Sequence, residues 1–559
     1  MVRVATADVV RRAPNRSPGD PRHHAETRTQ RARYHPRMAK LLQKMVNGDE
    51  GRRAAEPALT DRHGVTSWGD LDRRVNRLIH VLRSHGVQPG ERVAVLSGNR
   101  REAFEVIQAV AHSGILLVPI NWHFAPDEVR YVVENSESKV LFVDPTYGGA
   151  ADGIDLPRYD FVDHDRGGGS TYEDALAAAS DAEPDDQQMG GVMFYTSGTT
   201  GRPKGVKNTA FAGGVPPEVY ELMAAGMVNI GFPSDGRTLL CGPHYHSAQW
   251  AFSFFPMIGG SSIVLQEKFV PEETLRLIDE HAITNVHLVP TQFVRLLRAD
   301  DAAKAAFSGA SLQLVLHGAA PCSPQVKRQM IEWWGPKVTE YYGATEGGVV
   351  SMITAEEWLR KPGSVGKPMA TYLVRIQPED DDGAAVGDTG AEPFVPGTIH
   401  IRNLMGTDFE YLGEPEKTKD AHRLEGMFTL GDIGYLDDDG YLFLSDRKID
   451  MIISGGVNIY PAEIEGVLAG HPAIVDVAVF GIPDEEFGEQ VKAAVQLAPG
   501  STWDADTEAS VVAHAREHLA GYKVPRSFDV VETMPRSEAG KLVKRQLRNP
   551  YWEAAGRSI

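Results

Sequence analysis

The sequence predicts an α/β protein with two doubly wound, mostly parallel sheets in a large N-terminal domain. Short apolar runs alternate with amphipathic segments through most of residues 68–342, which is the pattern of parallel βαβ units. From about residue 371, short β segments separated by Gly, Asp and Pro indicate a small antiparallel β-barrel. Beyond residue 449, two strands between two helices predict a small α+β C-terminal domain.

The first sheet is expected between residues 68 and 143. Residues 68–85 carry apolar residues at helical spacing, and Ser67 stands where an N-cap belongs. Residues 146–190 are loop-rich and acidic, and they lead the chain to an apolar run at 192–195. The other strands are predicted at 92–96, 115–120 and 139–143, and the helices between them at 103–112 and 128–134.

The alternation resumes after residue 236 and predicts the second sheet. Three of its strands, at 237–241, 312–317 and 337–342, end in loops of small or hydroxyl-bearing residues. Ligands of doubly wound sheets bind beyond the carboxyl ends of the strands, so we expect these loops to converge on one site. The remaining strands are predicted at 261–265 and 285–289, and the helices at 271–281, 290–298 and 324–334.

Composition excludes several classes of protein. The 559 residues include 57 basic and 76 acidic side chains, and a net charge of -19 argues against a general binder of nucleic acid or anionic membranes. Cys241 and Cys322 are too few for a disulfide framework and lack neighbours at metal-ligand spacing. No apolar run is long enough to span a bilayer, and no signal-peptide pattern opens the chain. A reducing, cytoplasmic location is therefore expected.

Residues 1–37 differ in composition from the rest of the chain. Nine arginines face only three acidic residues there, with prolines scattered among them. Such a composition can indicate a transit peptide, but the prolines interrupt a continuous amphipathic helix. A flexible extension is the simpler interpretation. We therefore predict an extension at 1–37, the large domain at 38–448 and the C-terminal domain at 449–559.

Residues 195–205, YTSGTTGRPKG, predict a loop that binds polyphosphate. Three glycines permit a sharp turn and a close approach to a ligand. Four hydroxyls and exposed backbone N–H groups can surround an anion, and Lys204 adds a cation. The spacing differs from the Walker pattern, which ends in Gly-Lys-Ser/Thr and enters a helix directly. The alternative is a solvated polar hairpin loop.

Four further motifs follow the phosphate loop: EYYGATEGG (340–348), TLGDIGYLDDDGYLFLSDR (429–447), IISGGVNIYPAEIE (452–465) and PRSEAGKLVKR (535–545). With this order of motifs, the chain resembles the adenylate-forming (AMP-binding) superfamily over about residues 40–548, and is most similar to bacterial fatty-acyl-CoA synthetases. The resemblance implies that ATP and Mg²⁺ activate a carboxylic acid as acyl-AMP, with release of pyrophosphate. CoA, the co-substrate, then displaces AMP.

By this resemblance, residues of several loops bind the nucleotide. Glu346 would bind Mg²⁺, a hard cation that suits carboxylate oxygen, and Thr345 would bond the α-phosphate. Tyr342 would lie against adenine, whereas Tyr341 alternates to the opposite face and packs. The residues expected around the β- and γ-phosphates are Thr196, Ser197, Gly198, Thr199, Thr200 and Lys204. The others expected at the nucleotide are Gly318, Ala319 and Ala320 close beneath adenine, Gly343, Asp432 at the ribose, Arg447 at the ribose or phosphate, and Lys541.

Each assignment has a structural alternative. Strand tyrosines such as Tyr342 are commonly core residues. Glu346 could be a surface carboxylate at a turn, and Asp432 an ordinary turn residue. Arg447 could form a surface salt bridge of little energetic weight.

The resemblance makes Lys541, Thr199 and Glu346 the catalytic residues. Lys541 would bridge the carboxylate and α-phosphate oxygens in one orientation of a mobile C-terminal domain. The domain would then rotate about a hinge at Ile449, where many relatives have Asp or Lys, with Lys448 and Asp450 as alternatives. After this rotation, the pantetheine path of CoA would be lined by Ser454, Gly455 and Gly456.

The acyl pocket is expected around the segment 246–251 and the end of the strand at 337–342. His246 is either a gate or orienting group or a satisfied core histidine, and Trp250 either caps a ring or packs. Small residues at 343 and 344 permit a deep pocket, so fatty acids, aryl or cinnamate-like acids and sterol side-chain acids stay open. The predicted pocket residues are His246, Ser247, Trp250, Ala251, Gly343 and Ala344.

Two other functions stay open. The acyl-AMP could pass to a carrier protein, an amine or another small nucleophile, although the sequence carries no visible carrier domain. The chain could also be a non-catalytic nucleotide-binding protein, but intact Thr199, Lys204, Glu346, Asp432 and Lys541 argue against decay. The expected partners are a small carboxylic acid, ATP and CoA, with no nucleic acid, and the chain could form a homodimer.

Overall fold

Two α/β sheets and a C-terminal α+β unit make up the computed structural model of the chain. The structure describes residues 41–47, 53–167, 169–196, 203–209, 215–216, 218–378, 390–447, 450–454, 457–484, 487–536 and 542–555. Several predicted residues lie outside these ranges, namely Ser197, Gly198, Thr199, Thr200, Ile449, Gly455, Gly456 and Lys541.

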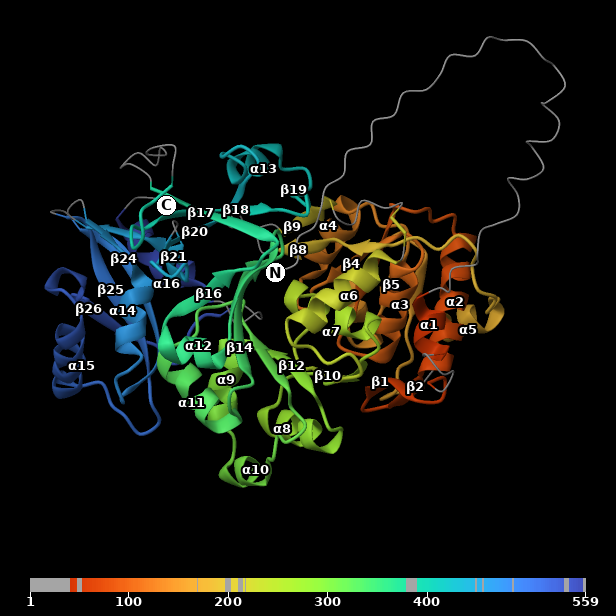
Figure 1. Cartoon of the computed structure of the whole chain (residues 1–559), viewed down its shortest axis with the longest axis horizontal. Coiled ribbons are helices and arrows are strands. Elements are labelled where there is room, and N and C mark those ends of the chain that lie inside the picture. The colour runs from red at the N-terminus through yellow and green to blue at the C-terminus, as the bar shows by residue number, and fades with distance from the viewer. Residues whose placement is uncertain are drawn as a thin grey trace, which may run out of the picture. The chain divides into compact units, whose positions relative to one another are not determined.

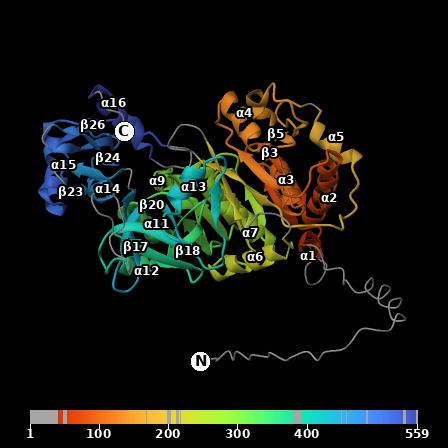
Figure 2. The ribbon, with the colours of Figure 1, turned by 90° about the horizontal axis from the view of Figure 1, so that it is seen from above.

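The first sheet is all parallel, in the order β6-β5-β3-β4-β7. Neighbouring residues of β3 point to opposite faces: Val93 and Val95 pack with α2 and α3, whereas Ala94 and Leu96 pack with α4 (Figure 2). The acidic segment predicted as loop-rich supplies β6 and α5. The strands are β3 (Arg92–Leu96), β4 (Leu116–Ile120), β5 (Leu141–Val143), β6 (Arg158–Asp160) and β7 (Gly191–Val192). The helices are α1 (Leu41–Asn47), α2 (Trp68–Ser84), α3 (Arg101–Ala111), α4 (Pro126–Asn135), the 3-10 helix at Pro145–Ala151 and α5 (Thr171–Ala178).

The second sheet is parallel from β1 through β11, β10, β12 and β13 to β14. Helices α8, α9, α11 and α12 cover the face that carries Val286 and Val315 (Figure 1). Its parallel strands are β1 (Pro57–Asp61), β10 (Arg237–Leu240), β11 (Ser262–Leu265), β12 (Asn285–Leu288), β13 (Leu314–His317) and β14 (Val338–Ala344); β2 (Gly64–Ser67) is antiparallel to β1. The helices of this part are α6 (Val219–Asn229), α7 (Ser247–Ile258), α8 (Pro271–Glu280), α9 (Pro290–Leu297), α10 (Asp301–Ala306), α11 (Pro324–Trp334) and α12 (Ala355–Arg360).

Helix α7 lies between the two sheets and was not predicted. Trp250 and Phe254 share one core with β3, β4, β10 and β11, while Phe252 packs in another core with Tyr341. Because α7 is apolar on nearly every side, its sequence carries no helical stripe. An all-round apolar helix is instead the pattern of a fully buried element.

The Gly/Asp/Pro-punctuated segments form antiparallel strands, as predicted, but these strands continue the second sheet, and no pairing among the described strands closes them into the separate barrel that was expected. The hydrogen-bonded order is β17-β18-β20-β21-β16-β15-β14. A separate three-stranded sheet, β19-β9-β8, holds the ends of the phosphate loop. These strands are β8 (Phe194–Thr196), β9 (Lys204–Asn208), β15 (Gly348–Ile353), β16 (Ser364–Pro368), β17 (Tyr372–Gln377), β18 (Gly397–Asn403), β19 (Phe409–Tyr411), β20 (Phe428–Leu436) and β21 (Leu442–Arg447), and α13 is Pro415–Ala421.

The C-terminal residues bury a core of their own. Three strands contribute Ile452, Val479 and Val495 to this core, and two helices contribute Ile464 and Val511. The strand order is β23-β22-β25-β24, with β26 parallel to β25. The elements are β22 (Ile452–Ser454), β23 (Val457–Ile459), α14 (Pro461–Leu468), β24 (Ile474–Asp484), β25 (Gly488–Leu497), α15 (Ala505–His518), the 3-10 helix at Gly521–Lys523, β26 (Ser527–Val530) and α16 (Lys544–Ala554).

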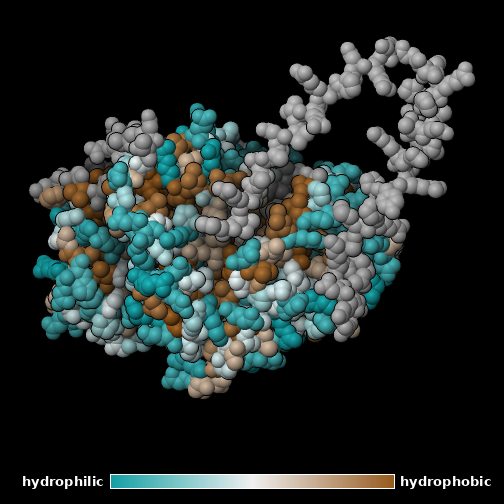
Figure 3. Space-filling view, viewed as in Figure 1, coloured by the Kyte–Doolittle hydropathy of each residue, from teal (hydrophilic) through white to brown (hydrophobic). Residues whose placement is uncertain are grey.

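The surface is mixed in polarity. Hydrophilic and hydrophobic residues alternate over the face seen in Figure 3, in keeping with a sequence of which 24% is charged. Among the helices that the structure describes, none is long and apolar enough to cross a membrane.

Candidate active site

The predicted phosphate loop connects β8 to β9; its residues 197–202 lie outside the described residues, and its two flanks pair as an antiparallel ladder. Thr196 lies opposite Lys204, and Tyr195 lies opposite Gly205. A side chain at Gly205 would approach the Tyr195 ring to 3.2 Å, so the close fit of the two strands favours glycine. Strand β19 extends the ladder on the other side of β9, with Tyr411 opposite Val206.

Lys204 begins β9 and has an altered acidity. Partial burial lowers the pKa of its ammonium to about 8, and the neighbouring Lys417 ammonium adds to this effect, while Glu414 opposes it. Lys417 belongs to α13 and pairs with Glu414 at 3.3 Å. Sequence reasoning predicted Lys204 as a phosphate ligand but did not single out Lys417.

The predicted adenine and ribose residues are in direct contact. The Tyr342 hydroxyl, from β14, donates a hydrogen bond of 2.7 Å to the Asp432 carboxylate, from β20. Tyr342 is 7% exposed and Asp432 is 9% exposed. Arg447 lies opposite Asp432 in the β20–β21 ladder. Tyr342 and Asp432, which are 90 residues apart in the sequence, therefore meet at one place.

Tyr341 points to the opposite face of β14, as strand alternation predicted. Its hydroxyl lies 3.2 Å from His287 Nε2, and its ring contacts Phe252 edge-on at 5.1 Å. Burial raises the pKa of Tyr341 and lowers the pKa of His287 to about 3, with a smaller contribution from His246 to the latter. His287 is therefore neutral at physiological pH, and Tyr341 belongs to the core.

The loop after β13 combines small residues with backbone strain. A side chain at Gly318 would come within 2.6 Å of the Tyr341 ring and carbonyl oxygen. The prediction explained this glycine by the space that adenine needs, but the structure gives packing against Tyr341 as the reason. Ala319 has φ +65°, which is a left-handed conformation. Such strain is concentrated at functional sites.

The loop after β14 carries the predicted phosphate and metal residues. The Thr345 hydroxyl lies 2.7 Å from the Ser247 hydroxyl at the start of α7. Glu346 accepts a hydrogen bond of 3.0 Å from the Tyr411 hydroxyl. This contact connects Glu346 to the three-stranded sheet that holds the phosphate loop, and sequence reasoning missed it because Tyr411 stands in a Gly- and Pro-containing segment that lacks strand alternation.

Gly343 allows close backbone packing within the β14–β15 hairpin. A side chain there would meet the Gly348 carbonyl oxygen at 1.9 Å, at a point where the ladder shifts register. The prediction attributed this small residue, with Ala344, to the depth of an acyl pocket. At Gly343, the space of a side chain is filled by backbone, so this position adds no depth.

The segment predicted to line the acyl pocket begins α7. His246 is the N-cap residue, and its ring lies 4.5 Å from that of Tyr245. Trp250 is 3% exposed and stacks on Phe254 at 4.5 Å, which favours the packing interpretation. Ala251 is partly buried against the same core.

The predicted C-terminal residues are only partly described. Ser454 ends β22 and lies opposite Val457 of β23. Gly455, Gly456, the hinge residue Ile449 and the predicted catalytic Lys541 lie outside the described residues, as do Ser197, Gly198, Thr199 and Thr200. Their roles stay predictions.

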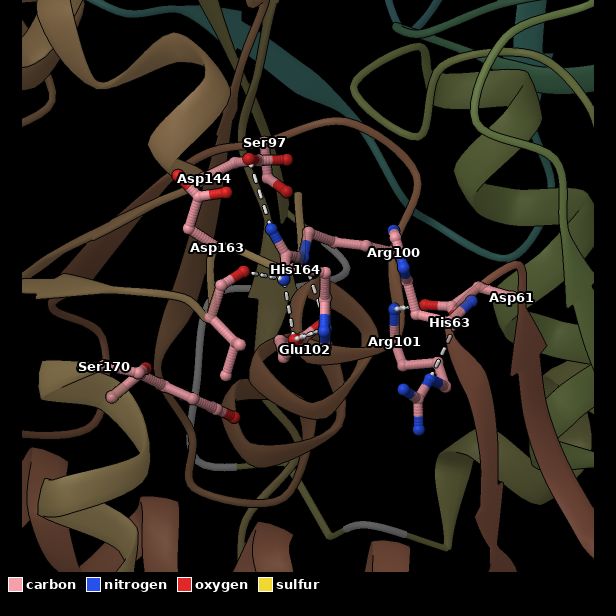
Figure 4. Close-up of polar contacts among 12 residues, drawn as sticks. Asp61, His63, Ser97, Arg100, Arg101, Glu102, Asp144, Asp163, His164 and Ser170 are labelled. Carbon is pink, nitrogen blue, oxygen red and sulfur yellow. Dashed lines mark hydrogen bonds and ion pairs between the residues drawn. The ribbon is translucent and has the colours of Figure 1, made fainter. Parts of the chain in front are cut away.

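A second polar cluster lies at the start of α3 (Figure 4). Arg100 contacts Glu102 at 2.7 Å and Asp144 at 3.2 Å, and Arg101 contacts Asp61 at 3.0 Å. Because both guanidinium groups are already paired, we interpret this cluster as a structural connection between β1, α3 and β5. It is not a second anion site.

No group of three or more His, Cys, Asp or Glu side chains gathers at metal-binding distance within the described ranges. Mg²⁺ does not need such a group, because it usually takes one or two carboxylates together with substrate phosphates and water. Glu346, whose carboxylate Tyr411 orients, fits this mode of binding.

In doubly wound α/β proteins, nucleotides bind at the loops that follow the carboxyl ends of the strands. Here, such loops lie near the buried Tyr342–Asp432 pair. Residues 49–405 match the AMP-binding enzyme family, and residues 463–541 match the AMP-binding enzyme C-terminal domain. The chain therefore belongs to the AMP-binding enzyme family, which confirms the predicted superfamily and fold class.

Curated relatives and solved structures cover nearly the whole chain. A feruloyl-CoA synthase from Amycolatopsis sp is 33% identical over 89% of this chain and 97% of that protein. The long-chain-fatty-acid–CoA ligase FadD13 of Mycobacterium tuberculosis is 32% identical over 87% of this chain and 93% of that protein. ATP-bound MatB from Rhodopseudomonas palustris has a TM-score of 0.77 and 28% identity, covering 92% of this chain and 99% of that one.

Proposed function

We propose that this enzyme is an ATP-dependent acyl-CoA synthetase that acts on a fatty or aryl carboxylic acid. The observation that carries the proposal is the buried contact between Tyr342 and Asp432, which joins the predicted adenine and ribose positions. The names of the feruloyl-CoA and fatty-acid–CoA relatives support an acid substrate and CoA as the acceptor.

In the first step, a carboxylate oxygen attacks the α-phosphorus of ATP, and the bond from that phosphorus to the bridging oxygen breaks. Pyrophosphate leaves with the electron pair, and acyl-AMP remains. Two anions must approach, so the site has to neutralise charge. Lys204 would hold the β- and γ-phosphates, and Thr345, which Ser247 positions, would bond the α-phosphate.

Glu346 and the substrate phosphates would hold Mg²⁺, which when bound neutralises phosphate charge. Tyr411 orients the Glu346 carboxylate for this task through the hydrogen bond described above. The remaining phosphate contacts are proposed for Thr196, Ser197, Gly198, Thr199 and Thr200, and Arg447 and Lys541 complete the nucleotide site in this proposal.

In the second step, the CoA thiolate attacks the acyl carbon, a thioester bond forms, and the bond to AMP breaks. We place the change between the steps in a rotation of the C-terminal domain about Ile449, which removes Lys541 from the site. Ser454, Gly455 and Gly456 would then leave room for the thin pantetheine arm.

A panel of carboxylic acids tests the proposal directly. Fatty acids of graded length and aryl acids such as hydroxycinnamates are incubated with the enzyme, ATP and Mg²⁺, with and without CoA. Pyrophosphate release and the products are then measured by mass spectrometry. We expect acyl-AMP without CoA and an acyl-CoA thioester with it, for at least one acid. Pyrophosphate release without any thioester would remove CoA as the acceptor, and no release with any acid would remove the adenylation step itself.

A further inference from the structure

The loop of residues 345–347, which joins β14 to β15, is held by hydroxyl groups from three different elements. Ser247 of α7 contacts its first residue, and Tyr411 of β19 donates to its second. The third contact comes from β17, where the Tyr372 hydroxyl donates a hydrogen bond of 2.6 Å to the Gly347 carbonyl oxygen. Three consecutive residues, with Glu346 in the middle, are therefore held from outside the hairpin.

The ladder of the β14–β15 hairpin closes this loop without those contacts. Ala344 lies opposite Gly348, directly beside the loop. Contacts from remote elements therefore determine where the loop lies relative to the rest of the domain. The fit is close, because a side chain at Gly347 would approach the Phe428 ring to 2.8 Å. The backbone on both sides of Glu346 is held in place.

Asn403, which lies opposite Tyr372 in the β17–β18 ladder, sets the direction of the Tyr372 hydrogen bond. The Met405 N–H, which can only donate, contacts Asn403 Oδ1 at 2.8 Å. Asn403 Nδ2 in turn donates to the Thr407 hydroxyl at 2.6 Å and to the Tyr372 hydroxyl oxygen at 3.4 Å. The single hydroxyl hydrogen of Tyr372 therefore goes to the Gly347 carbonyl oxygen, which can only accept.

The segment 403–411, which supplies Asn403 and Tyr411, is also tied to the end of β9. The Asp408 N–H donates to the Thr209 hydroxyl at 2.7 Å, and the Thr209 N–H donates to the Asp408 carbonyl oxygen at 2.8 Å. Thr209 directly follows β9. One segment thus connects the 345–347 loop to the strand that begins at Lys204, a predicted phosphate ligand.

We propose that Tyr372 is a positioning residue for the binding of Mg²⁺ by Glu346, and that Asn403 acts through Tyr372. The inference rests on the proposed function, in which Glu346 holds Mg²⁺ together with the substrate phosphates. Groups that orient a metal-binding carboxylate contribute to metal affinity although they do not touch the metal. Tyr372 has this role because it holds the backbone of the residue that follows Glu346.

The test compares Tyr372→Phe with Tyr441→Phe. Tyr441 is a matched control, because its hydroxyl also donates one hydrogen bond, of 3.3 Å, but to Glu357 of α12. The dissociation constant of ATP is measured by calorimetry in EDTA and in Mg²⁺, and the ratio of the two values is the gain from Mg²⁺. We expect Tyr372→Phe to reduce this gain about tenfold and to leave ATP binding in EDTA unchanged. Tyr441→Phe should change neither value.

Two results for Tyr372→Phe would overturn the inference. An unchanged gain from Mg²⁺ would show that the hydroxyl does not position the carboxylate. Equal weakening of ATP binding in EDTA and in Mg²⁺ would show a general loss of structure in the nucleotide site. Wild-type enzyme that gains nothing from Mg²⁺ would instead overturn the magnesium role of Glu346 in the proposed function, so the two failures are distinguishable.

Asn403→Asp tests the direction of the hydrogen bond. A carboxylate has nearly the shape of the amide but cannot donate, so the Tyr372 hydrogen should turn toward it and away from Gly347. We expect Asn403→Asp to reduce the gain from Mg²⁺ as Tyr372→Phe does, and to cause no further loss when the two substitutions are combined. The same additional loss in the combined variant would mean that the new charge acts without Tyr372, which would contradict the proposed role of Asn403.

Discussion

The adjacent residues Tyr341 and Tyr342 provide a matched test of the nucleotide site. Tyr342→Phe removes the hydroxyl that donates to Asp432 at 2.7 Å, and both residues are less than a tenth exposed. A hydrogen bond to a charged acceptor contributes about 1.5–3 kcal/mol, and burial leaves little water to replace it. If Asp432 needs this bond to face the ribose, as proposed, its loss reduces ATP binding by up to this free energy, and since 1.4 kcal/mol corresponds to a factor of ten, ATP should bind roughly 10- to 100-fold more weakly.

Tyr341→Phe is the control, because it removes a hydroxyl from the neighbouring residue on the other face. That hydroxyl contacts His287 at 3.2 Å, away from Asp432. Losing this neutral hydrogen bond should cost about 1 kcal/mol of stability and leave ATP affinity within about twofold. Calorimetry with ATP and thermal unfolding of both variants measure the two effects separately.

Two results would contradict the assignment of Tyr342 and Asp432 to the nucleotide site. If Tyr341→Phe weakened ATP binding as much as Tyr342→Phe, the two faces of β14 would not be functionally distinct. If Tyr342→Phe bound ATP like wild type, the Tyr342–Asp432 contact would be a core contact only. The assignment of adenine and ribose to this place would then be lost.

Three further predictions concern contacts that the structure describes. Tyr411→Phe removes the donor that orients Glu346, so the Mg²⁺ concentration for half-maximal activity should rise about tenfold; an unchanged magnesium titration would contradict this role. Lys327→Met leaves Glu340 buried without its cation, which should lower the free energy of unfolding in denaturant by about 3–5 kcal/mol. Adding Glu340→Gln should restore much of that loss. If it restores none, the ion pair is not the cause. Ala319→Val should lower the unfolding midpoint because a β-branched residue resists φ +65°, whereas Ala319→Gly should not, and equal effects would exclude backbone strain.

The buried Lys327–Glu340 pair illustrates what sequence reasoning overlooked. Lys327 lies in a predicted helix, and Glu340 is the first residue of the motif EYYGATEGG, so the sequence gives no sign that either side chain is buried. In the structure, burial lowers the pKa of Lys327 and raises the pKa of Glu340, because loss of water outweighs their mutual attraction. Packing of α11 and α12 on β13 and β14 creates this environment, with His317 3.9 Å from Glu340 and the Lys327 ammonium over the Trp358 ring.

Local patterns predicted the parts of the fold that depend on local physics. The helix at α2 begins after Ser67, whose hydroxyl accepts from the Asp70 N–H at 3.1 Å, as the N-cap prediction required. Alternation along β14 placed Tyr341 and Tyr342 on opposite faces. Helix α7 was not predicted, because it is buried on nearly all sides and its sequence has no polar stripe. Strand β19 was not predicted, because it is short and pairs with a strand some 200 residues away in the sequence.

The family, the alternating α/β architecture and the order of the predicted nucleotide-binding motifs could be read from the chain alone, because periodicity and motif spacing are properties of neighbouring residues. Which of these residues meet depends on how the chain folds. Tyr342 with Asp432, Thr345 with Ser247, and Glu346 with Tyr411 are contacts between separate segments. Each depends on strand order and on the packing of helices against sheets, which no local pattern encodes.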